Sequence, residues 1–300
     1  MKAALLRVLI EGFGRLPAGV LYPLAWLAGT LAWLVSPGLR GVTRDHMDHI
    51  PGLDSNPRAR DRAARGCARA VALYWVDLAR TAHLPADGAF DEYASFEGLP
   101  HLFEAVDRGC GVVLVTAHLG APEFAVRAGP QLGLDVLALI ERNASPRVNA
   151  ILQRARRGLG ARYAEATAGG ARTALDHLRR GGTVALIADR DIARTGISVP
   201  FFEERTTLPA GPVELARRTG AALVPCFVLR RGVARYSVRF EPALPVARTS
   251  DRQRDIEAGT LALARALEAG IAAAPAQWFV TAPIWSGLHA RAHTAGRGRP

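Results

Sequence analysis

The chain has 300 residues, and its 49% hydrophobic content is enough to bury a sizeable core in one large domain or two small ones. Its formal net charge is +11, and arginine carries almost all of the positive charge because Lys2 is the only lysine. This composition excludes a disordered chain, and the charge favours anionic partners: phospholipid head groups, nucleic acid or phosphate-bearing small molecules.

The first predicted element is apolar. Residues 16–35, LPAGVLYPLAWLAGTLAWLV, run for twenty positions without a charge, about the length of a helix that spans a bilayer. Pro17 and Pro23 interrupt the run, and the flanking residues lack the pattern of a secretory signal. We therefore predict a membrane-associating helix or hairpin within residues 1–40, with Trp26 and Trp33 at the interface. The alternative is an apolar helix that packs on the protein's own core.

Helical and strand patterns then alternate. Residues 56–83 place arginines and apolar residues at helical spacing, which predicts a helix with one basic face. Strands are predicted at 93–96, 111–117, 134–140, 183–188, 222–229 and 235–240, and further helices near 99–108, 122–132, 145–159, 170–180, 210–219 and 252–273. These alternating runs predict an α/β fold with a largely parallel central sheet covered by helices on both faces. We assign residues 41–288 to this domain and residues 289–300 to a disordered basic tail.

Cysteine and histidine spacing predicts neither a disulfide framework nor a metal site. The three cysteines at 67, 110 and 226 are far apart, which favours a reducing cytoplasmic compartment. The cluster of His46, Asp48 and His49 has no recognisable ligand spacing, so we expect no metal there.

Ionisable residues follow three apolar runs at the point where each run ends. His118 follows VVLVTA, Glu141 follows VLALI, and Asp189 with Arg190 follows TVALIA. Ligands of open α/β sheets bind beyond the carboxyl ends of the strands, so these side chains are candidates for one site. Each could instead be an ordinary helix cap or ion-pair partner.

The segment HLGAPE places His118 five residues before Glu123. One continuous helix would separate these side chains by roughly 140° around its axis, so a turn must lie between them. Gly120 permits that turn, and Pro122 suits the start of a helix whose first turn would hold Glu123, with its carboxylate directed back to His118. A carboxylate on one imidazole nitrogen frees the other as a base, and no serine or cysteine nucleophile stands beside it. We therefore predict direct attack by a substrate hydroxyl.

Three segments carry a resemblance to a known family. AHLGAPE at 117–123 resembles the His, four residues, Asp/Glu motif of bacterial glycolipid acyltransferases, which include the lipid A late acyltransferases and the mycobacterial phosphatidylinositol mannoside acyltransferases. The block at 186–225, with its acidic residues, Phe-Phe and Gly-Pro, and PAQWFVTAPIW at 275–285 are similar to later family motifs. From about residue 94 onward the chain is identified as a member of this family. It departs from the family at Ala121 and Pro122, where Asn-Trp is common.

The resemblance implies roles for the matching positions. His118 would be the general base on the acceptor hydroxyl, with Glu123 as its partner and Asp189 as a further catalytic acid residue. Glu141 and Arg156 match polar positions that would bind substrate. The fold would be glycerolipid acyltransferase-like, and the acyl donor would be acyl-CoA or acyl carrier protein, with no cofactor and no metal required.

These expectations combine into one predicted function. The protein would transfer a fatty acyl chain from acyl-CoA to a hydroxyl of a membrane glycolipid at the cytoplasmic face of the inner (plasma) membrane. The segments ADRDIARTG and FVTAPIW favour phosphatidylinositol mannoside as the acceptor. Arg156 and Arg190 could hold phosphates of the donor or acceptor, or could belong to a solvated basic face.

Three alternatives remain at this stage: a lipid A late acyltransferase, a lysophospholipid acyltransferase, and a basic membrane-bound scaffold that has lost catalysis. Nucleic acid is not an expected partner, because the sequence lacks basic strands interleaved with aromatic residues.

Overall fold

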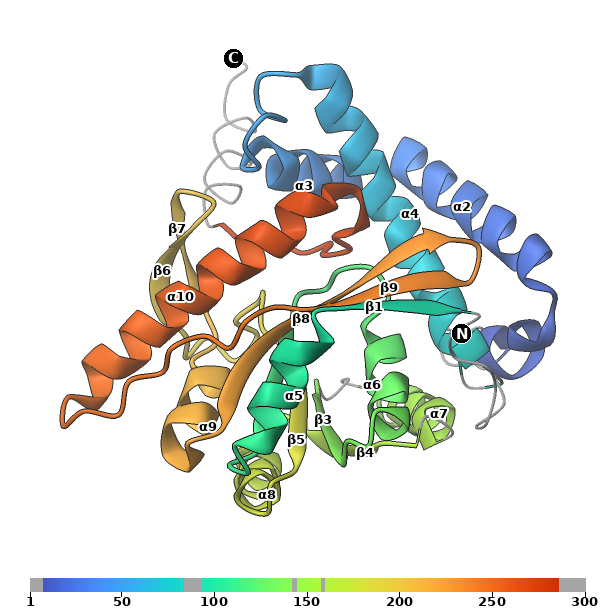
Figure 1. Cartoon of the computed structure of the whole chain (residues 1–300). Coiled ribbons are helices and arrows are strands. Elements are labelled where there is room, and N and C mark those ends of the chain that lie inside the picture. Colours follow the sequence, from blue (N-terminus) through green and yellow to red (C-terminus); the bar gives the residue numbers. More distant parts are fainter. Residues whose placement is uncertain (1–7, 82, 84–92, 142–144, 158–159, 286–300) are drawn as a thin grey trace.

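The computed structural model describes residues 8–81, 83, 93–141, 145–157 and 160–285 (Figure 1). The tail predicted at 289–300 lies outside the described residues. The described helices are η1 (Val8–Gly12), η2 (Phe13–Arg15), α2 (Ala18–Val35), α3 (Pro37–Asp48), α4 (Pro57–Thr81), α5 (Leu99–Asp107), α6 (Pro122–Gln131), α7 (Pro146–Arg157), α8 (Ala168–Arg179), α9 (Gly211–Thr219), α10 (Arg252–Ala273) and η4 (Pro275–Gln277). The described strands are β1 (Ala94–Glu97), β2 (Val112–Thr116), β3 (Val136–Ile140), β4 (Arg162–Glu165), β5 (Thr183–Ile187), β6 (Ile197–Phe201), β7 (Glu204–Leu208), β8 (Ala222–Gly232) and β9 (Arg235–Phe240).

Seven strands form the central sheet in the order β1-β9-β8-β2-β5-β3-β4. Every neighbouring pair is parallel except β8 and β9, which form an antiparallel hairpin. The central strands are almost continuously apolar because both of their faces are covered. The carboxyl ends of β2, β5 and β3 therefore lie side by side at one edge of the sheet.

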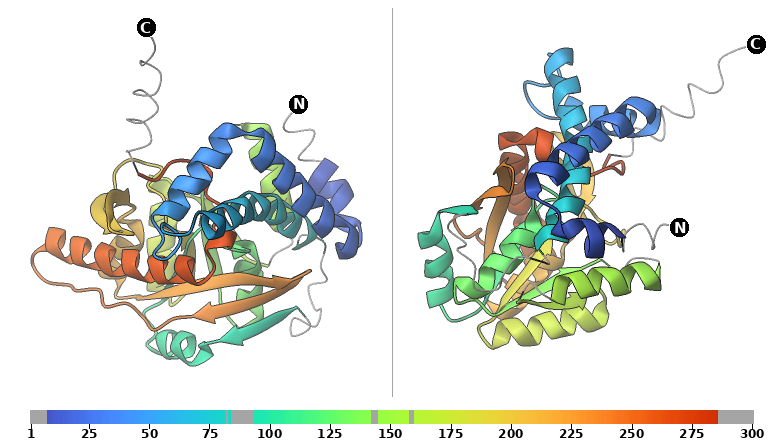
Figure 2. Two further views of the ribbon diagram at one scale, coloured as in Figure 1. Left: turned by 90° about the horizontal axis from the view of Figure 1, so that it is seen from above. Right: turned by 90° about the vertical axis from the view of Figure 1, so that its right-hand side faces the viewer.

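Helices cover both faces of the sheet, which confirms the predicted fold class. One face packs on α5 and α6 around a core that includes Leu102 and Phe124, and the other packs on α8, α9 and α10 around a core that includes Leu178 and Leu263. Seen from above, α10 and α5 lie on opposite sides of the sheet (Figure 2).

The N-terminal helices α2 and α3 pack against α4 beside this domain (Figures 1 and 2). The predicted apolar segment forms one helix, α2, which continues through Pro23 without the expected interruption, at the cost of one hydrogen bond to the carbonyl of Gly19. Close packing explains Gly29, since a Cβ atom there would lie 2.5 Å from the Cα of Arg69 on α4. Among the described helices, α2 alone is long and apolar enough to cross a membrane, and 28% of its 18 residues are buried.

Candidate active site

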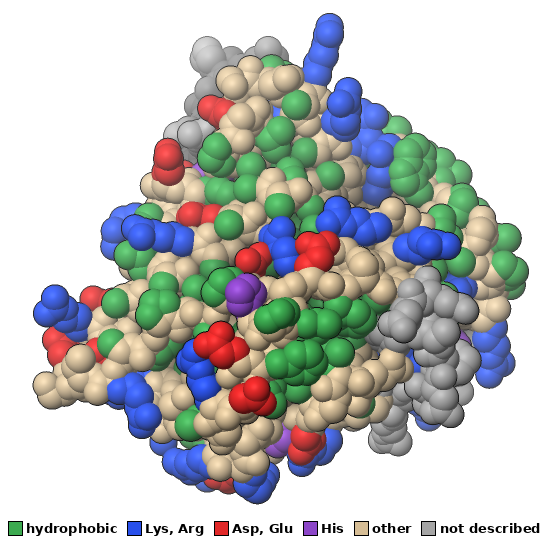
Figure 3. Space-filling view, viewed as in Figure 1, with side chains coloured by type: hydrophobic (Ala, Val, Ile, Leu, Met, Phe, Trp, Pro, Cys, Tyr) green, Lys and Arg blue, Asp and Glu red, His purple; other side chains and the backbone are tan. Residues whose placement is uncertain are grey.

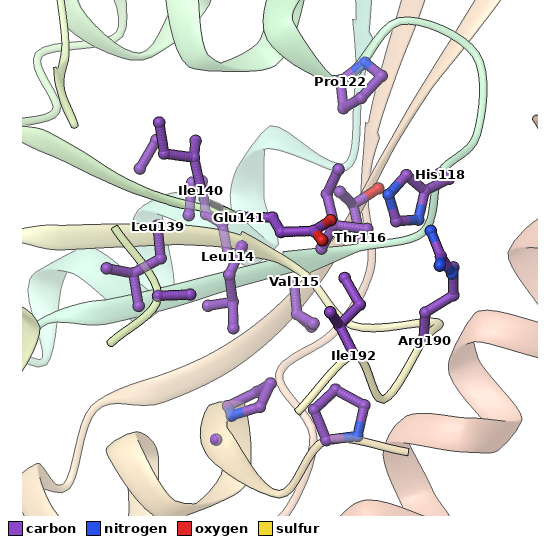
Figure 4. Close-up of a pocket in the computed structure, with 18 of the residues that line it drawn as sticks. Leu114, Val115, Thr116, His118, Pro122, Leu139, Ile140, Glu141, Arg190 and Ile192 are labelled. Atoms are coloured by element: carbon purple, nitrogen blue, oxygen red, sulfur yellow. The ribbon is translucent and has the colours of Figure 1, made fainter. Parts of the chain in front are cut away.

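Residues from three neighbouring strand ends meet at one edge of the sheet. β2 is followed by His118, β5 by Asp189 and β3 by Glu141, and β5 is paired with both of the other strands. The parallel register brings these residues together, as the sequence predicted. In Figure 4 the side chains of Glu141 and Arg190 point into a cavity toward His118.

The turn that carries His118 is held by backbone contacts from two directions. Gly120 has a φ of 62°, and a Cβ atom at this position would lie 1.9 Å from the carbonyl oxygen of Val228 on β8, so only glycine fits. Its N–H donates to the carbonyl oxygen of Gln277 at 3.1 Å, and the N–H of Phe279 donates to the carbonyl oxygen of His118 at 2.8 Å. β8 and the segment after α10 therefore fix the position of His118, and the next helix, α6, begins at Pro122 as predicted.

Asp189 is the carboxylate that orients His118. Its Oδ1 lies 2.6 Å from His118 Nδ1, and its Oδ2 accepts the backbone N–H of His118 at 3.0 Å and the indole N–H of Trp278 at 2.8 Å. A carboxylate partner places the proton of the neutral imidazole on Nδ1, which leaves Nε2 as the basic nitrogen. The His118 side chain is 22% exposed whereas Asp189 is fully buried, so the imidazole reaches the cavity and the carboxylate does not.

The surroundings keep Asp189 ionised. Burial alone would raise its pKa, but the charge of His118 and the hydrogen bonds from His118 and Trp278 outweigh burial and lower the pKa below its usual value. Trp278 itself is fully buried and packs against His46 with ring centroids 5.0 Å apart. Burial lowers the pKa of His46 to about 4, so this neighbour is neutral near pH 7.

The carboxylate of Glu123 has a different partner from the one that the sequence predicted. It occupies the first turn of α6, but its Oε1 accepts hydrogen bonds from Arg156 Nε at 3.1 Å and Nη2 at 2.7 Å, and from the Tyr74 hydroxyl at 3.3 Å. No contact between described residues joins Glu123 to His118. The fixed guanidinium fork of Arg156 binds the carboxylate in place of the imidazole, so the expected His118–Glu123 hydrogen bond is not found.

The Glu123–Arg156 pair is buried, with both side chains 11% exposed. Burial opposes the charged form of Arg156, yet the charge of Glu123 and its hydrogen bonds raise the pKa of the guanidinium above its usual value. Tyr74 links this pair to His118 through Phe279: its ring stacks on that of Phe279 at 4.8 Å, and Phe279 meets the His118 ring edge-on at 5.6 Å.

A cavity of about 940 Å³ opens at the strand ends. Five of the six predicted site residues line its wall, and the sixth, Asp189, lies behind His118. Glu141 and Arg190 form no hydrogen bond or ion pair with a residue that the structure describes, and both line the cavity. Most of the remaining wall is apolar, including Leu114, Val115, Val126, Leu139, Leu186 and Leu215.

Sequence reasoning missed Trp278 and Tyr74. Trp278 lies in a segment that carries the family resemblance, but nothing local shows that its indole reaches a carboxylate 89 residues earlier. Tyr74 lies on a basic amphipathic helix and looks like an ordinary packing residue. Both contacts depend on long-range topology.

Comparison with known proteins agrees with this architecture. A sequence profile of bacterial lipid A biosynthesis acyltransferases matches residues 25–286. A phosphatidylinositol mannoside acyltransferase of Mycolicibacterium smegmatis is 32% identical over 231 residues, which make up 75% of this chain and 73% of that protein. A phosphatidylinositol mannoside acyltransferase of Mycobacterium tuberculosis is 34% identical over 194 residues, or 63% of this chain and 58% of that protein. The chain belongs to the bacterial lipid A biosynthesis acyltransferase family.

Proposed function

We propose that this acyltransferase moves a long acyl chain from acyl-CoA to a hydroxyl of phosphatidylinositol mannoside. The observation that carries the proposal is the histidine at the end of β2, held by a buried carboxylate at 2.6 Å and exposed to a largely apolar cavity. Such a cavity suits a hydrocarbon chain, and its volume is near the upper end of the range of about 300–1,000 Å³ for ligand pockets. The mannoside acceptor is supported by the names of the relatives.

The reaction follows from the orientation of the imidazole. His118 Nε2 removes the proton of the acceptor hydroxyl as its oxygen attacks the thioester carbonyl carbon. The tetrahedral intermediate collapses with cleavage of the C–S bond, and the leaving thiolate takes the proton from His118. The products are an ester and free coenzyme A. Asp189 stabilises the imidazolium and remains ionised throughout.

A covalent acyl-cysteine route has little support. Cys226 also lines the cavity, but burial raises the pKa of its thiol to about 12, so the thiolate is scarce at neutral pH. Direct transfer from donor to acceptor is therefore the proposed route.

Membrane association of the enzyme rests on α2. Its outward face carries exposed apolar side chains, and Arg69 stacks on Trp26 with its Cζ 3.7 Å from the ring centroid. Figure 3 shows hydrophobic side chains gathered over α2 with basic side chains beside them. An apolar helix with an arginine flank suits the surface of an anionic bilayer. We propose that the enzyme works at the cytoplasmic face of the inner membrane.

The test is transfer by purified protein from palmitoyl-CoA, with mass spectrometry of the product lipid. Phosphatidylinositol mannoside, a lipid A precursor and a lysophospholipid would be offered as acceptors, and acyl carrier protein as an alternative donor. We expect an added acyl chain on the mannoside alone. His118→Ala should lower the rate by about 10²–10⁴-fold, whereas His101→Ala, the same change on α5 away from the cavity, should not.

Transfer to the lipid A precursor in preference to the mannoside would overturn the proposed acceptor, and transfer from carrier protein with acyl-CoA inert would overturn the proposed donor. Near-normal turnover by the His118→Ala protein would overturn the proposed base.

A further inference from the structure

The cavity reaches both faces of the sheet. Successive residues of a strand point to opposite faces, yet Leu114 and Val115 of β2 both line it, and so do Ala185 and Leu186 of β5. β5 pairs with β2 along its whole length, and its pairing with β3 continues as far as Ala185 and Ala138, so the cavity cannot cross the sheet before that point. The cavity therefore passes from one face to the other beyond this pair, at the carboxyl ends of the strands.

Burial along β5 supports the same conclusion independently of the cavity's outline. Thr183 and Val184 are buried, whereas the next two residues, Ala185 and Leu186, are only half-buried although they point to opposite faces of a central strand. A strand in the middle of a doubly covered sheet is normally buried on both faces. Both covering layers are therefore incomplete over the same end of β5.

The cavity thus has two chambers, each walled by a different hydrophobic core. The α6 chamber lies on the face covered by α6 and is lined by Leu114, Val126, Val136, Ala185, Cys226 and Val228. The α9 chamber lies on the face covered by α8 and α9 and is lined by Val115, Leu139, Leu175, Leu186, Pro212 and Leu215. They join at the strand ends, where Thr116, His118 and Arg190 lie (Figure 4).

We infer that the enzyme holds two hydrocarbon chains at once, one on each face of the sheet, with His118 between them. A thioester donor brings one acyl chain, so a second apolar chamber of the same character fits a chain of the lipid acceptor. This inference rests on the proposed function, because it takes the acceptor to be a lipid that already carries acyl chains.

The position of α4 assigns the chambers. Tyr74 and Trp75 of α4 line the cavity on the α6 side, and α4 also packs on α2, the helix with the exposed apolar face. A lipid chain that leaves the membrane beside α2 therefore meets the α6 chamber first. We assign the acceptor chain to the α6 chamber and the donor chain to the α9 chamber.

Two substitutions at adjacent positions of one strand test the inference. Ala185→Leu narrows the α6 chamber and Leu186→Trp narrows the α9 chamber, so each controls for the other. A third variant, Phe103→Trp, adds bulk on the exposed surface of α5. Rates would be measured with donors of increasing chain length and with acceptors that carry their acyl chains or lack them.

We expect Leu186→Trp to shift the donor chain length that gives the highest rate to shorter chains. The preference for the acylated over the deacylated acceptor should stay unchanged. Ala185→Leu should raise KM for the acylated acceptor several-fold and leave the donor optimum unchanged. The Phe103→Trp protein should match the wild type. If both chamber variants change only the donor profile, the two chambers hold parts of one substrate and the inference is wrong.

A binding experiment tests the two-chamber inference separately from the proposed reaction. His118→Ala protein would be titrated by calorimetry with a non-transferable thioether analogue of palmitoyl-CoA, then with acylated phosphatidylinositol mannoside. If there are two chambers, the affinity for the lipid in the presence of saturating thioether analogue should stay within about twofold of its value without the analogue. Competition between the two ligands would overturn the inference. Simultaneous binding with no turnover by the wild type would instead overturn the proposed reaction alone.

Discussion

At the scale of single residues, Trp278 helps to hold His118 and Asp189, the proposed catalytic pair, in place. Asp189 receives hydrogen bonds from the ring and backbone of His118 and one from Trp278, which is supplied by a distant part of the chain. The indole N–H stabilises the carboxylate and fixes its plane without contacting the cavity. Trp278 is therefore a positioning residue whose effect on the reaction passes through Asp189.

Trp278→Phe should move the acidic limb of the rate profile to higher pH. The variant removes a donor that stabilises the Asp189 carboxylate, so the carboxylate holds the proton of the imidazolium more tightly. Since the proposed reaction needs unprotonated His118, activity at pH 6 should fall more than activity at pH 8. A hydrogen bond to a charged group is worth about 1.5–3 kcal/mol, so the limb should shift by at most about one to two pH units. A uniform loss of rate at all pH values would show that Trp278 acts only through packing.

Glu123 and Arg156 should behave as a structural pair. Arg156→Met leaves a buried carboxylate without its counter-charge, and such losses cost about 3–5 kcal/mol of unfolding free energy. The double variant Glu123→Met/Arg156→Met should recover much of this loss, as measured by chemical denaturation. Glu123→Gln should leave the acidic limb of the rate profile in place. A shift of that limb as large as that of Trp278→Phe would restore Glu123 as a partner of His118.

At the scale of elements, the sequence predicts those helices and strands whose apolar pattern is clear within a short stretch of the chain. Apolar periodicity located six of the seven strands of the sheet, all except β4, and the α-helices from α4 onward to within a few residues. The hairpin of β6 and β7 was missed because its two turn residues, Phe202 and Glu203, have φ of 50° and 67°, a conformation usually signalled by glycine or asparagine. Short, charged β4 gives little apolar signal at all.

Other departures arise from packing that is absent from the local sequence. α3 was missed, although Ser36 caps it by accepting the N–H of Leu39 and Pro37 begins it, a recognisable start signal. Trp33, predicted at the membrane interface, is 3% exposed because it packs beneath α3 and α4, whereas Trp26 is 48% exposed. Three strand-end residues of the site could be predicted from one rule of α/β sheets, but the choice of Asp189 over Glu123 as the partner of His118 depends on side-chain geometry across the sheet.

The outward face of α2 should control membrane binding. Leu27 and Leu31 are 49% and 50% exposed, and replacing either by glutamate removes apolar area and adds a negative charge. Burial of one leucine is worth about 1.5–3 kcal/mol, so each variant should weaken binding to anionic vesicles about tenfold or more in a sedimentation assay. Phe103→Glu, an equally exposed apolar site on α5, is the control. Equal losses in all three variants would remove α2 as the docking element.

At the scale of the whole molecule, Asp77 joins the N-terminal helices to the sheet. This buried carboxylate on α4 accepts the hydroxyl protons of Tyr22 on α2 at 2.5 Å and Tyr236 on β9 at 2.7 Å, and it pairs with Arg230 on β8. Arg230 also donates to the carbonyl oxygen of Gly120 at 3.4 Å, in the turn that carries His118. The helix proposed to meet the membrane is thus connected to the active-site turn by a short series of buried contacts.

Asp77→Asn should destabilise the protein more than the loss of either tyrosine hydroxyl that it accepts. It leaves Arg230 buried without a counter-charge, which costs about 3–5 kcal/mol, whereas Tyr22→Phe and Tyr236→Phe each remove one hydrogen bond to a charged group, worth about 1.5–3 kcal/mol. Urea denaturation followed by tryptophan fluorescence would rank the three. A smaller loss in Asp77→Asn than in Tyr22→Phe would mean that the cluster is not organised around its carboxylate.

The return of the chain to His118 after α10 has a consequence for biosynthesis. Gln277, Trp278 and Phe279 supply the contacts that fix the Gly120 turn, the Asp189 carboxylate and the backbone of His118. All three are translated after every strand of the sheet has left the peptidyl-transferase centre. A nascent chain therefore contains His118 and Asp189 before it contains the residues that hold them in place. The site can therefore be completed only once a segment that follows the whole sheet in the chain has been synthesised.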